Sequence, residues 1–143
     1  MRGLRIVTFE PSHLAELDPP VFCRDQMQRF AAGYRPAGPA FSLMEAGRPL
    51  GCGGLLIESG EGRAWAFLSD SLRRRPMLLH RTAKRALPAL IAHYELQAVS
   101  AEAHADFLGA RRWLERLGFR YEGFLPRFAG TTENYARYRL WAH

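Results

Sequence analysis

The order of strand-like and helix-like segments in the second half of the chain limits the fold most strongly. Apolar runs at 63–68, 96–103 and 119–125 predict strands, and apolar residues at helical spacing fill the stretches 78–94 and 107–117. Strands that alternate with helices in this way are typically parallel neighbours joined by helical crossovers. We therefore expect parallel pairing in this half of the chain.

The first half predicts a different kind of pairing. The runs at 41–46 and 50–58 and the strand at 63–68 are separated by short turns that contain glycine, which is typical of an antiparallel meander. Glycines inside the middle run indicate a bulge or a close approach of another backbone. With a first strand at 4–9, two helices after it and a last strand at 135–141, the predicted order is βααβββαβαββ.

Length and composition agree with one α/β domain. The chain has 143 residues, of which 48% are hydrophobic and 24% are charged, as in a typical globular protein. We predict a single domain over residues 1–143, with a mixed, mainly antiparallel, twisted sheet and helices on both faces. No apolar run approaches the ~18 residues of a membrane span, and the N-terminus does not resemble a secretory signal. Cys23 and Cys52 form no metal-binding pattern, so we expect buried thiols in a cytoplasmic protein.

Positive charge is concentrated in one segment. The chain has a formal net charge of +6, and the stretch 71–86 holds six basic residues and no acidic one. Such a block favours binding of a polyanion, which could be a phosphorylated ligand, a nucleic acid or an acidic protein. The alternative is an ordinary solvent-exposed helix face, and the sequence leaves these two interpretations level. Nucleic acid is the least favoured partner, because no nucleic-acid motif accompanies the charge.

The run 110–123 (ARRWLERLGFRYEG) resembles the last helix and the following strand of N-acetyltransferases of the GNAT superfamily. The predicted order of elements is also that of these proteins, so the resemblance covers nearly the whole chain. It implies a GNAT-like fold and the transfer of an acyl group from acyl-CoA, with acetyl-CoA as the cofactor, to an amine acceptor of unknown identity.

The chain also resembles a degenerate branch of that superfamily, the gene-thirteen-like morphogenesis proteins of podoviruses and their relatives in other phages and prophages. This resemblance rests on Gly53-Gly54, on Ser69-Asp70 and on the stretches 81–85 and 114–118. It implies the alternative function: a catalytically inactive phage or prophage protein that acts in morphogenesis or binds a host protein. The expected location is the cytoplasm of a bacterium or of a phage-infected host, and a protein partner or a homodimer stays open.

In GNAT enzymes, a glycine-containing loop before a long helix binds the CoA pyrophosphate. The corresponding stretch 70–81 has no glycine, and Pro76 lacks an N–H donor. The resemblance therefore assigns cofactor binding to a strand end and the arginines that follow it, which could hold phosphate by charge-assisted hydrogen bonds. These candidate residues are Leu68, Ser69, Arg73, Arg74 and Arg75.

Two side chains are candidate catalytic bases. His104 follows a predicted strand and Asp70 ends another, and either could take a proton from an amine. The alternatives are a loop histidine beside a helix cap at Asp106, and a cap role for Asp70 itself. Positions where GNAT enzymes often carry an Asn and a general-acid Tyr hold Phe107 and Leu114, which can perform neither role.

Overall fold

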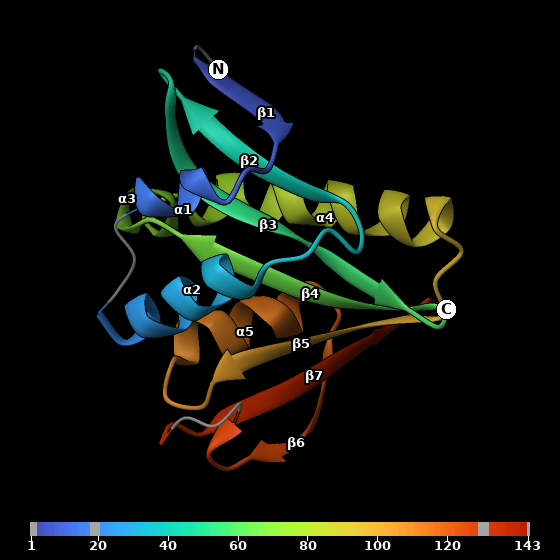
Figure 1. The fold of residues 1–143 in the computed structure, drawn as a ribbon. Coiled ribbons are helices and arrows are strands. Elements are labelled where there is room, and N and C mark those ends of the chain that lie inside the picture. The colour runs from blue at the N-terminus through green and yellow to red at the C-terminus, as the bar shows by residue number, and fades with distance from the viewer. Residues whose placement is uncertain (1–2, 18–20, 129–131, 143) are drawn as a thin grey trace. The chain divides into compact units, whose positions relative to one another are not determined.

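A computed structural model describes residues 3–17, 21–128 and 132–142, without the side chains of 21–23. Seven strands form one sheet in the order β1-β2-β3-β4-β5-β7-β6 (Figure 1). The strands are β1 (Leu4–Thr8), β2 (Ala40–Glu45), β3 (Arg48–Glu58), β4 (Glu61–Leu68), β5 (Ala98–His104), β6 (Arg120–Leu125) and β7 (Tyr135–Trp141). The helices are α1 (Ser12–Ala15), α2 (Val21–Gly33), α3 (Asp70–Arg73), α4 (Pro76–His93) and α5 (Leu108–Arg116).

The sheet is mixed and mainly antiparallel, which confirms the predicted α/β class. The β1–β2, β2–β3, β5–β7 and β6–β7 pairs are antiparallel, and β4 and β5 are parallel. Residue contacts divide the chain into two compact units. Unit 1 is Met1–Leu56 with Trp65–Leu79, and unit 2 is Ile57–Ala64 with His80–His143. Whether 1–143 is one domain stays a prediction, and the two units are described separately.

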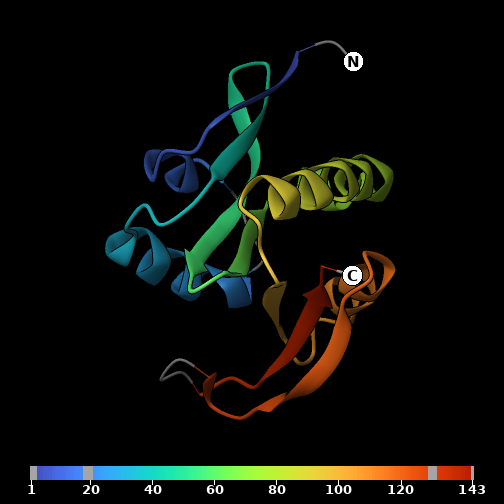
Figure 2. The ribbon, with the colours of Figure 1, turned by 90° about the vertical axis from the view of Figure 1, so that its right-hand side faces the viewer.

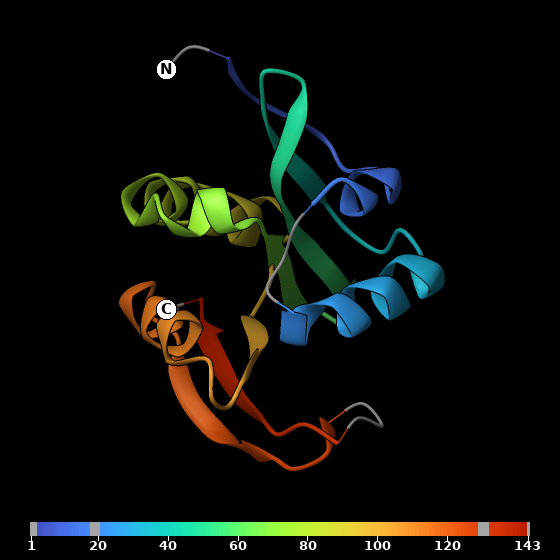
Figure 3. The ribbon, with the colours of Figure 1, turned by 90° about the vertical axis from the view of Figure 1, so that its left-hand side faces the viewer.

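Unit 1 is built on an aromatic and aliphatic core. The helices α1 and α2 lie on the same side of strands β1 to β3 (Figures 2 and 3). The buried centre contains Phe9, Leu14, Leu17, Met27, Cys52 and Phe67. Around it, the Trp65 ring meets Phe9 edge-on, with centroids 4.9 Å apart, and lies 4.5 Å from the ring of Phe30. Large aromatic side chains therefore join α2 to β4, as their burial energy favours.

A short polar chain crosses this core. The Ser42 hydroxyl lies 2.7 Å from Nδ1 of His13 and 3.3 Å from the Cys52 sulfur, and all three residues are buried. Burial raises the pKa of the Cys52 thiol to about 11, so this thiol stays protonated at neutral pH. The predicted buried thiol is confirmed for Cys52, whereas the side chain of Cys23 lies outside the described residues.

The glycines of β3 allow close packing within unit 1, most strictly at Gly54. A Cβ on Gly54 would lie 2.4 Å from the Pro39 carbonyl oxygen, and one on Gly51 would lie 2.7 Å from Leu72 Cδ2. The close approach expected from the sequence is therefore made by neighbouring segments of unit 1. A separate irregularity lies between Leu43 and Met44, where the β2–β3 register shifts.

Unit 2 contains the parallel pairing. The β4–β5 ladder runs from Glu61–Ala98 to Ala64–Ala101. The expectation that β5 and β6 are parallel neighbours is wrong, because β7 lies between them. β7 follows β6 after a short connection and pairs antiparallel with both strands, from Ala98–Trp141 to His104–Tyr135 on the β5 side.

The helices of the second half differ from expectation in their ends. Phe107 occupies the N-cap of α5 without a side-chain hydrogen bond, so the predicted cap at Asp106 is wrong. Pro88 lies inside α4, which runs from Pro76 to His93. No helix in the described part of the chain is long and apolar enough to cross a membrane.

Candidate functional site

The candidate cofactor segment follows the end of β4 in unit 1. Ser69 is the N-cap of α3: its hydroxyl accepts a hydrogen bond from the Leu72 amide at 3.2 Å. The Ser69 amide donates to the Leu50 carbonyl at 2.9 Å, and Leu72 packs where Gly51 leaves space. Ser69 therefore performs the cap role that the alternative interpretation gave to Asp70. Asp70 is the first residue of the helix instead, where a carboxylate complements the helix dipole.

Two of the three candidate arginines are engaged in ion pairs. Arg75 donates two parallel hydrogen bonds to the Glu45 carboxylate, at 3.0 and 2.8 Å. The bonds from Arg75 lower the pKa of Glu45, and the same bonds raise the pKa of Arg75. Arg73 pairs with Asp70 at 3.2 Å. The forked pair with Glu45 occupies the Arg75 donors that would otherwise bind a phosphate. Arg75 therefore links this segment to β2.

Arg74 differs from its neighbours. It is exposed, and its side chain forms no ion pair within the part of the chain that the structure describes. Its amide donates to the Asp70 carbonyl at 3.1 Å, which places Arg74 at the C-cap of α3. Pro76 then begins α4 and contributes no N–H. Among the three arginines that were predicted to bind phosphate, Arg74 is thus the one available to bind an anion.

The two candidate bases have different surroundings. The Asp70 side chain is 54% exposed, with the Arg73 guanidinium at one oxygen. His104 lies in unit 2, where its Nδ1 accepts a hydrogen bond from the Asp106 amide at 3.2 Å. The ring proton of neutral His104 is therefore on Nε2, which faces a Glu133 oxygen at 3.0 Å. Both ring nitrogens are engaged, and His104 is the last residue of β5, opposite Tyr135, so the alternative of a loop histidine is wrong.

These contacts sort the predicted residues into two groups. Leu68, Ser69, Asp70 and the three arginines form one continuous turn in unit 1. His104 belongs to unit 2, with Glu133 and the ring of Tyr135 beside it. The structure thus brings Asp70 and Arg74 together in one short helix, while His104 has partners of its own.

An ion-paired sheet face in unit 2 was not anticipated from the sequence. The Glu102 side chain is only 6% exposed and accepts hydrogen bonds from Arg63 at 2.9 Å and from Arg137 at 3.3 Å. Arg139 pairs with Glu122 at 2.6 Å and also with Glu61. Polar or charged residues at alternate positions, as Ser100, Glu102 and His104 in one strand and Arg137 and Arg139 in the other, are the sequence signal that could have indicated it.

The other face of these strands carries α5. The hydroxyl of the buried Tyr138 accepts from Arg111 Nε at 3.0 Å and donates to Glu115 at 3.3 Å. The bond to Tyr138 raises the pKa of Arg111. Leu114 is buried and Phe107 caps the helix, so neither position supplies an acid or an amide. The described residues also contain no cluster of side chains suited to a metal ion.

Comparison with known proteins supports the fold. No protein-family model matches the sequence, and no curated protein matches it. Among solved structures, a mutant of spermidine N-acetyltransferase SpeG from Vibrio cholerae has a TM-score of 0.69 at 14% identity, covering 98% of this chain and 94% of that one. The ribosomal-protein-S18-alanine N-acetyltransferase from Escherichia coli has a TM-score of 0.68 at 16% identity, with 97% and 94% covered.

A ribosomal-protein-S5-alanine acetyltransferase from Vibrio fischeri gives a TM-score of 0.72 at 11% identity, with 99% of this chain and 94% of that chain covered. The likeness extends over nearly the whole length of each protein, and identities this low speak for the fold alone. The fold of this chain is therefore that of the GNAT N-acetyltransferases.

Proposed function

We propose that this protein transfers an acyl group from acyl-CoA to an amine. The observation that supports this most is the similarity of its fold, over 97–99% of the chain, to enzymes that are named as N-acetyltransferases of different amines. The exposed Arg74 supports it further, because it has no carboxylate partner among the described residues and a free guanidinium is suited to a phosphate.

In this proposal, unit 1 provides the cofactor contacts. Arg74 binds a CoA phosphate, and the Ser69 cap and the Arg75–Glu45 pair hold the turn that carries it. Leu68, at the end of β4, supplies part of the wall beside the cofactor. Acetyl-CoA supplies the activated thioester. Because this segment has no glycine loop, it would bind the CoA phosphates with a charged side chain, whereas GNAT enzymes bind them with backbone amides.

The amine must lose a proton as it attacks. We assign this proton to Asp70, whose exposed carboxylate can accept it. His104 of unit 2 stays the other candidate base, although its ring nitrogens already bind the Asp106 amide and Glu133. The bound amine's orientation would then supply most of the rate.

Calorimetric titration with acetyl-CoA, at low and at physiological salt, tests the cofactor site. Arg74→Glu should weaken binding at least about tenfold, because it replaces attraction to phosphate with repulsion. Arg48→Glu is the matched control, since Arg48 is an exposed arginine of unit 1 without an ion pair among the described residues. Absence of binding by the unaltered protein, or equal affinity of the Arg74 variant, would contradict the cofactor assignment.

An acetylation assay on a panel that includes spermidine and peptides with N-terminal alanine tests the reaction. Asp70→Asn should lower kcat by about a hundredfold or more with little change in acetyl-CoA affinity. Glu58→Gln, an exposed carboxylate of unit 2, should leave kcat unchanged. Equal kcat for the Asp70 variant would remove Asp70 from the catalytic role.

A second function is favoured by the ion pairs of Arg73 and Arg75. If these pairs and the missing glycines leave no cofactor site, the protein is a catalytically inactive member of the fold that binds another protein. This is the alternative of a phage or prophage protein that acts in morphogenesis or on a host protein. Acetyl-CoA turnover with any amine in the panel would exclude it.

A further inference from the structure

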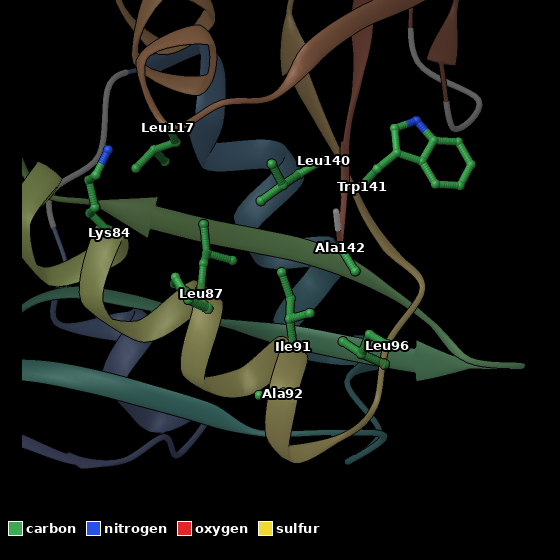
Figure 4. Close-up of a pocket in the computed structure, with 10 residues that line it drawn as sticks. Lys84, Leu87, Ile91, Ala92, Leu96, Leu117, Leu140, Trp141 and Ala142 are labelled. Atoms are coloured by element: carbon green, nitrogen blue, oxygen red, sulfur yellow. The ribbon is translucent and has the colours of Figure 1, made fainter.

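Unit 2 contains a groove that no part of the proposed function uses (Figure 4). It has a volume of about 540 Å³. We call it the α4 groove, and it is lined by Lys84, Leu87, Pro88, Ile91, Ala92, Leu96, Leu117, Leu140, Trp141 and Ala142. All of these residues belong to unit 2.

One wall of the groove is a helix whose apolar side chains are only half-buried. None of the residues of α4 is buried, although the helix has 18 residues. Leu87 and Ile91, one helical turn apart, face Leu140 of β7 across the groove (Figure 4). Leu96, which is buried, closes one end. The Trp141 ring points away from the space, so the interior is aliphatic (Figure 4).

The only charged side chain among the described lining residues is a cation. Lys84 lies at the end of the groove opposite Leu96 (Figure 4). It is exposed and forms no ion pair with another described residue, and the helix 76–93 contains no Asp or Glu. Arg81 and Arg85, within one helical turn of Lys84, increase the positive potential there. The groove thus has an aliphatic interior and a positive end.

Pro88 adds a second polar feature near the positive end. A proline has no N–H, so Pro88 cannot donate the helical hydrogen bond to the Lys84 carbonyl four residues earlier. The Lys84 ammonium is the donor at this end that can bind an anion, whereas the Lys84 carbonyl can only accept a hydrogen bond from a ligand donor. Small-molecule sites typically combine an apolar lining of this size with a few polar groups that fix the ligand's orientation.

We propose that the α4 groove binds a medium-chain aliphatic carboxylate. The alkyl chain lies along Leu87, Ile91 and Leu140, and the carboxylate pairs with the Lys84 ammonium. Charge complementarity selects this ligand over a neutral or cationic amphiphile, since the lining offers a cation and no carboxylate. The site is distinct from the acyl-CoA contacts proposed above, which lie in unit 1.

Titration with decanoate, followed by calorimetry, tests the site, and two variants that fill the groove give it a location. Ala92 and Ala142 line the groove from different elements and are both exposed, so Ala92→Trp and Ala142→Trp should each weaken decanoate binding at least about tenfold without burying a new residue in the core. Ala89→Trp is the matched control, because Ala89 is an exposed alanine of α4 outside the lining. No binding by the unaltered protein, or equal binding by both filling variants, would overturn the proposal.

The assignment of an anion has its own test. Lys84→Gln should weaken binding of decanoate by up to about fivefold and leave binding of 1-decanol unchanged, as expected for one solvent-exposed charge pair. Equal decanoate affinity in the variant would overturn the carboxylate assignment. Saturating acetyl-CoA should leave decanoate affinity unchanged. Displacement by acetyl-CoA would instead make the groove part of the cofactor site, whereas failure of acetyl-CoA to bind at all would affect only the proposed function.

Discussion

The arginines on the strands of unit 2 and the cations on its helix α4 have the same charge and opposite surroundings. Arg63, Arg137 and Arg139 each contact a carboxylate across the sheet. Arg81, Lys84 and Arg85 have no such partner among the described residues. The difference follows from geometry, because cross-strand neighbours bring acids and bases together, while α4 has no acid of its own. Binding of anions is therefore expected on the helix, and stability is expected from the strands.

The largest effect on stability is expected when Glu102, the carboxylate shared by Arg63 and Arg137, is removed. Glu102→Ala should lower the free energy of unfolding by about 2 kcal/mol, because two guanidiniums lose the buried acceptor between them. Urea denaturation measures the change. Glu58→Ala, which removes an exposed carboxylate in unit 2, should stay within about 0.5 kcal/mol. Equal losses of unfolding free energy in the two variants would mean that the ion pairs of Glu102 do not stabilise the sheet.

A matched pair of arginines gives the next largest effect. Arg120 and Arg139 lie directly opposite each other on β6 and β7, but Arg120 has no ion pair among the described residues. Arg139→Met should cost about 1 kcal/mol, since Glu61 and Glu122 lose their partner. Arg120→Met should cost less than about 0.5 kcal/mol, and a reversed order would contradict the assignment of the network.

The Arg75–Glu45 pair predicts a pH dependence in unit 1. Because Arg75 holds the folded-state pKa of Glu45 below 4.5, the pair stabilises the fold above that pH. This contribution should be lost as the pH falls from about 4.5 through the lowered pKa. Melting temperatures measured across this window should fall more steeply for the unaltered protein than for Glu45→Gln, and parallel curves would exclude the pair as a source of stability.

The smallest expected effect comes from a substitution that introduces an ion pair on α4. Arg81 and Arg85 are four residues apart on α4, a spacing at which like charges repel. Arg81→Glu should raise the free energy of unfolding by roughly 0.5 kcal/mol, because repulsion is replaced by an ion pair. Added salt should shrink the difference in thermal unfolding. A gain that persists at high salt would have another cause.

Much of the fold could be predicted because local patterns determine it. The seven strands and the long helices follow from runs of apolar residues, and the glycines of β3 correctly indicated a close backbone approach. The place of β7 between β5 and β6 could not be predicted, since the same alternation of residues satisfies either neighbour order. The cap at Ser69 rather than Asp70 depends on a one-residue difference in where α3 begins.

In the candidate site, too, contacts between residues that are distant in sequence could not be predicted. Residues 68–75 follow one another in the sequence, so their closeness in space needs no tertiary contact, and their role as a cofactor site stays a prediction. The engagement of Arg75 by Glu45, 30 residues earlier, has no signature in spacing. One partner of His104 is equally distant in sequence, since Glu133 lies 29 residues later. Which cations remain available to a ligand therefore depends on tertiary pairing.

The insertion of β7 between two earlier strands affects how the protein is made. A ribosome releases β5 and then β6, and neither can hydrogen-bond to the other in the finished sheet. Both strands must wait, with their edges open, until β7 emerges and pairs with each. Nascent chains thus expose these strand edges during the interval between the synthesis of β6 and that of β7, and unpaired edges are templates for pairing with other chains.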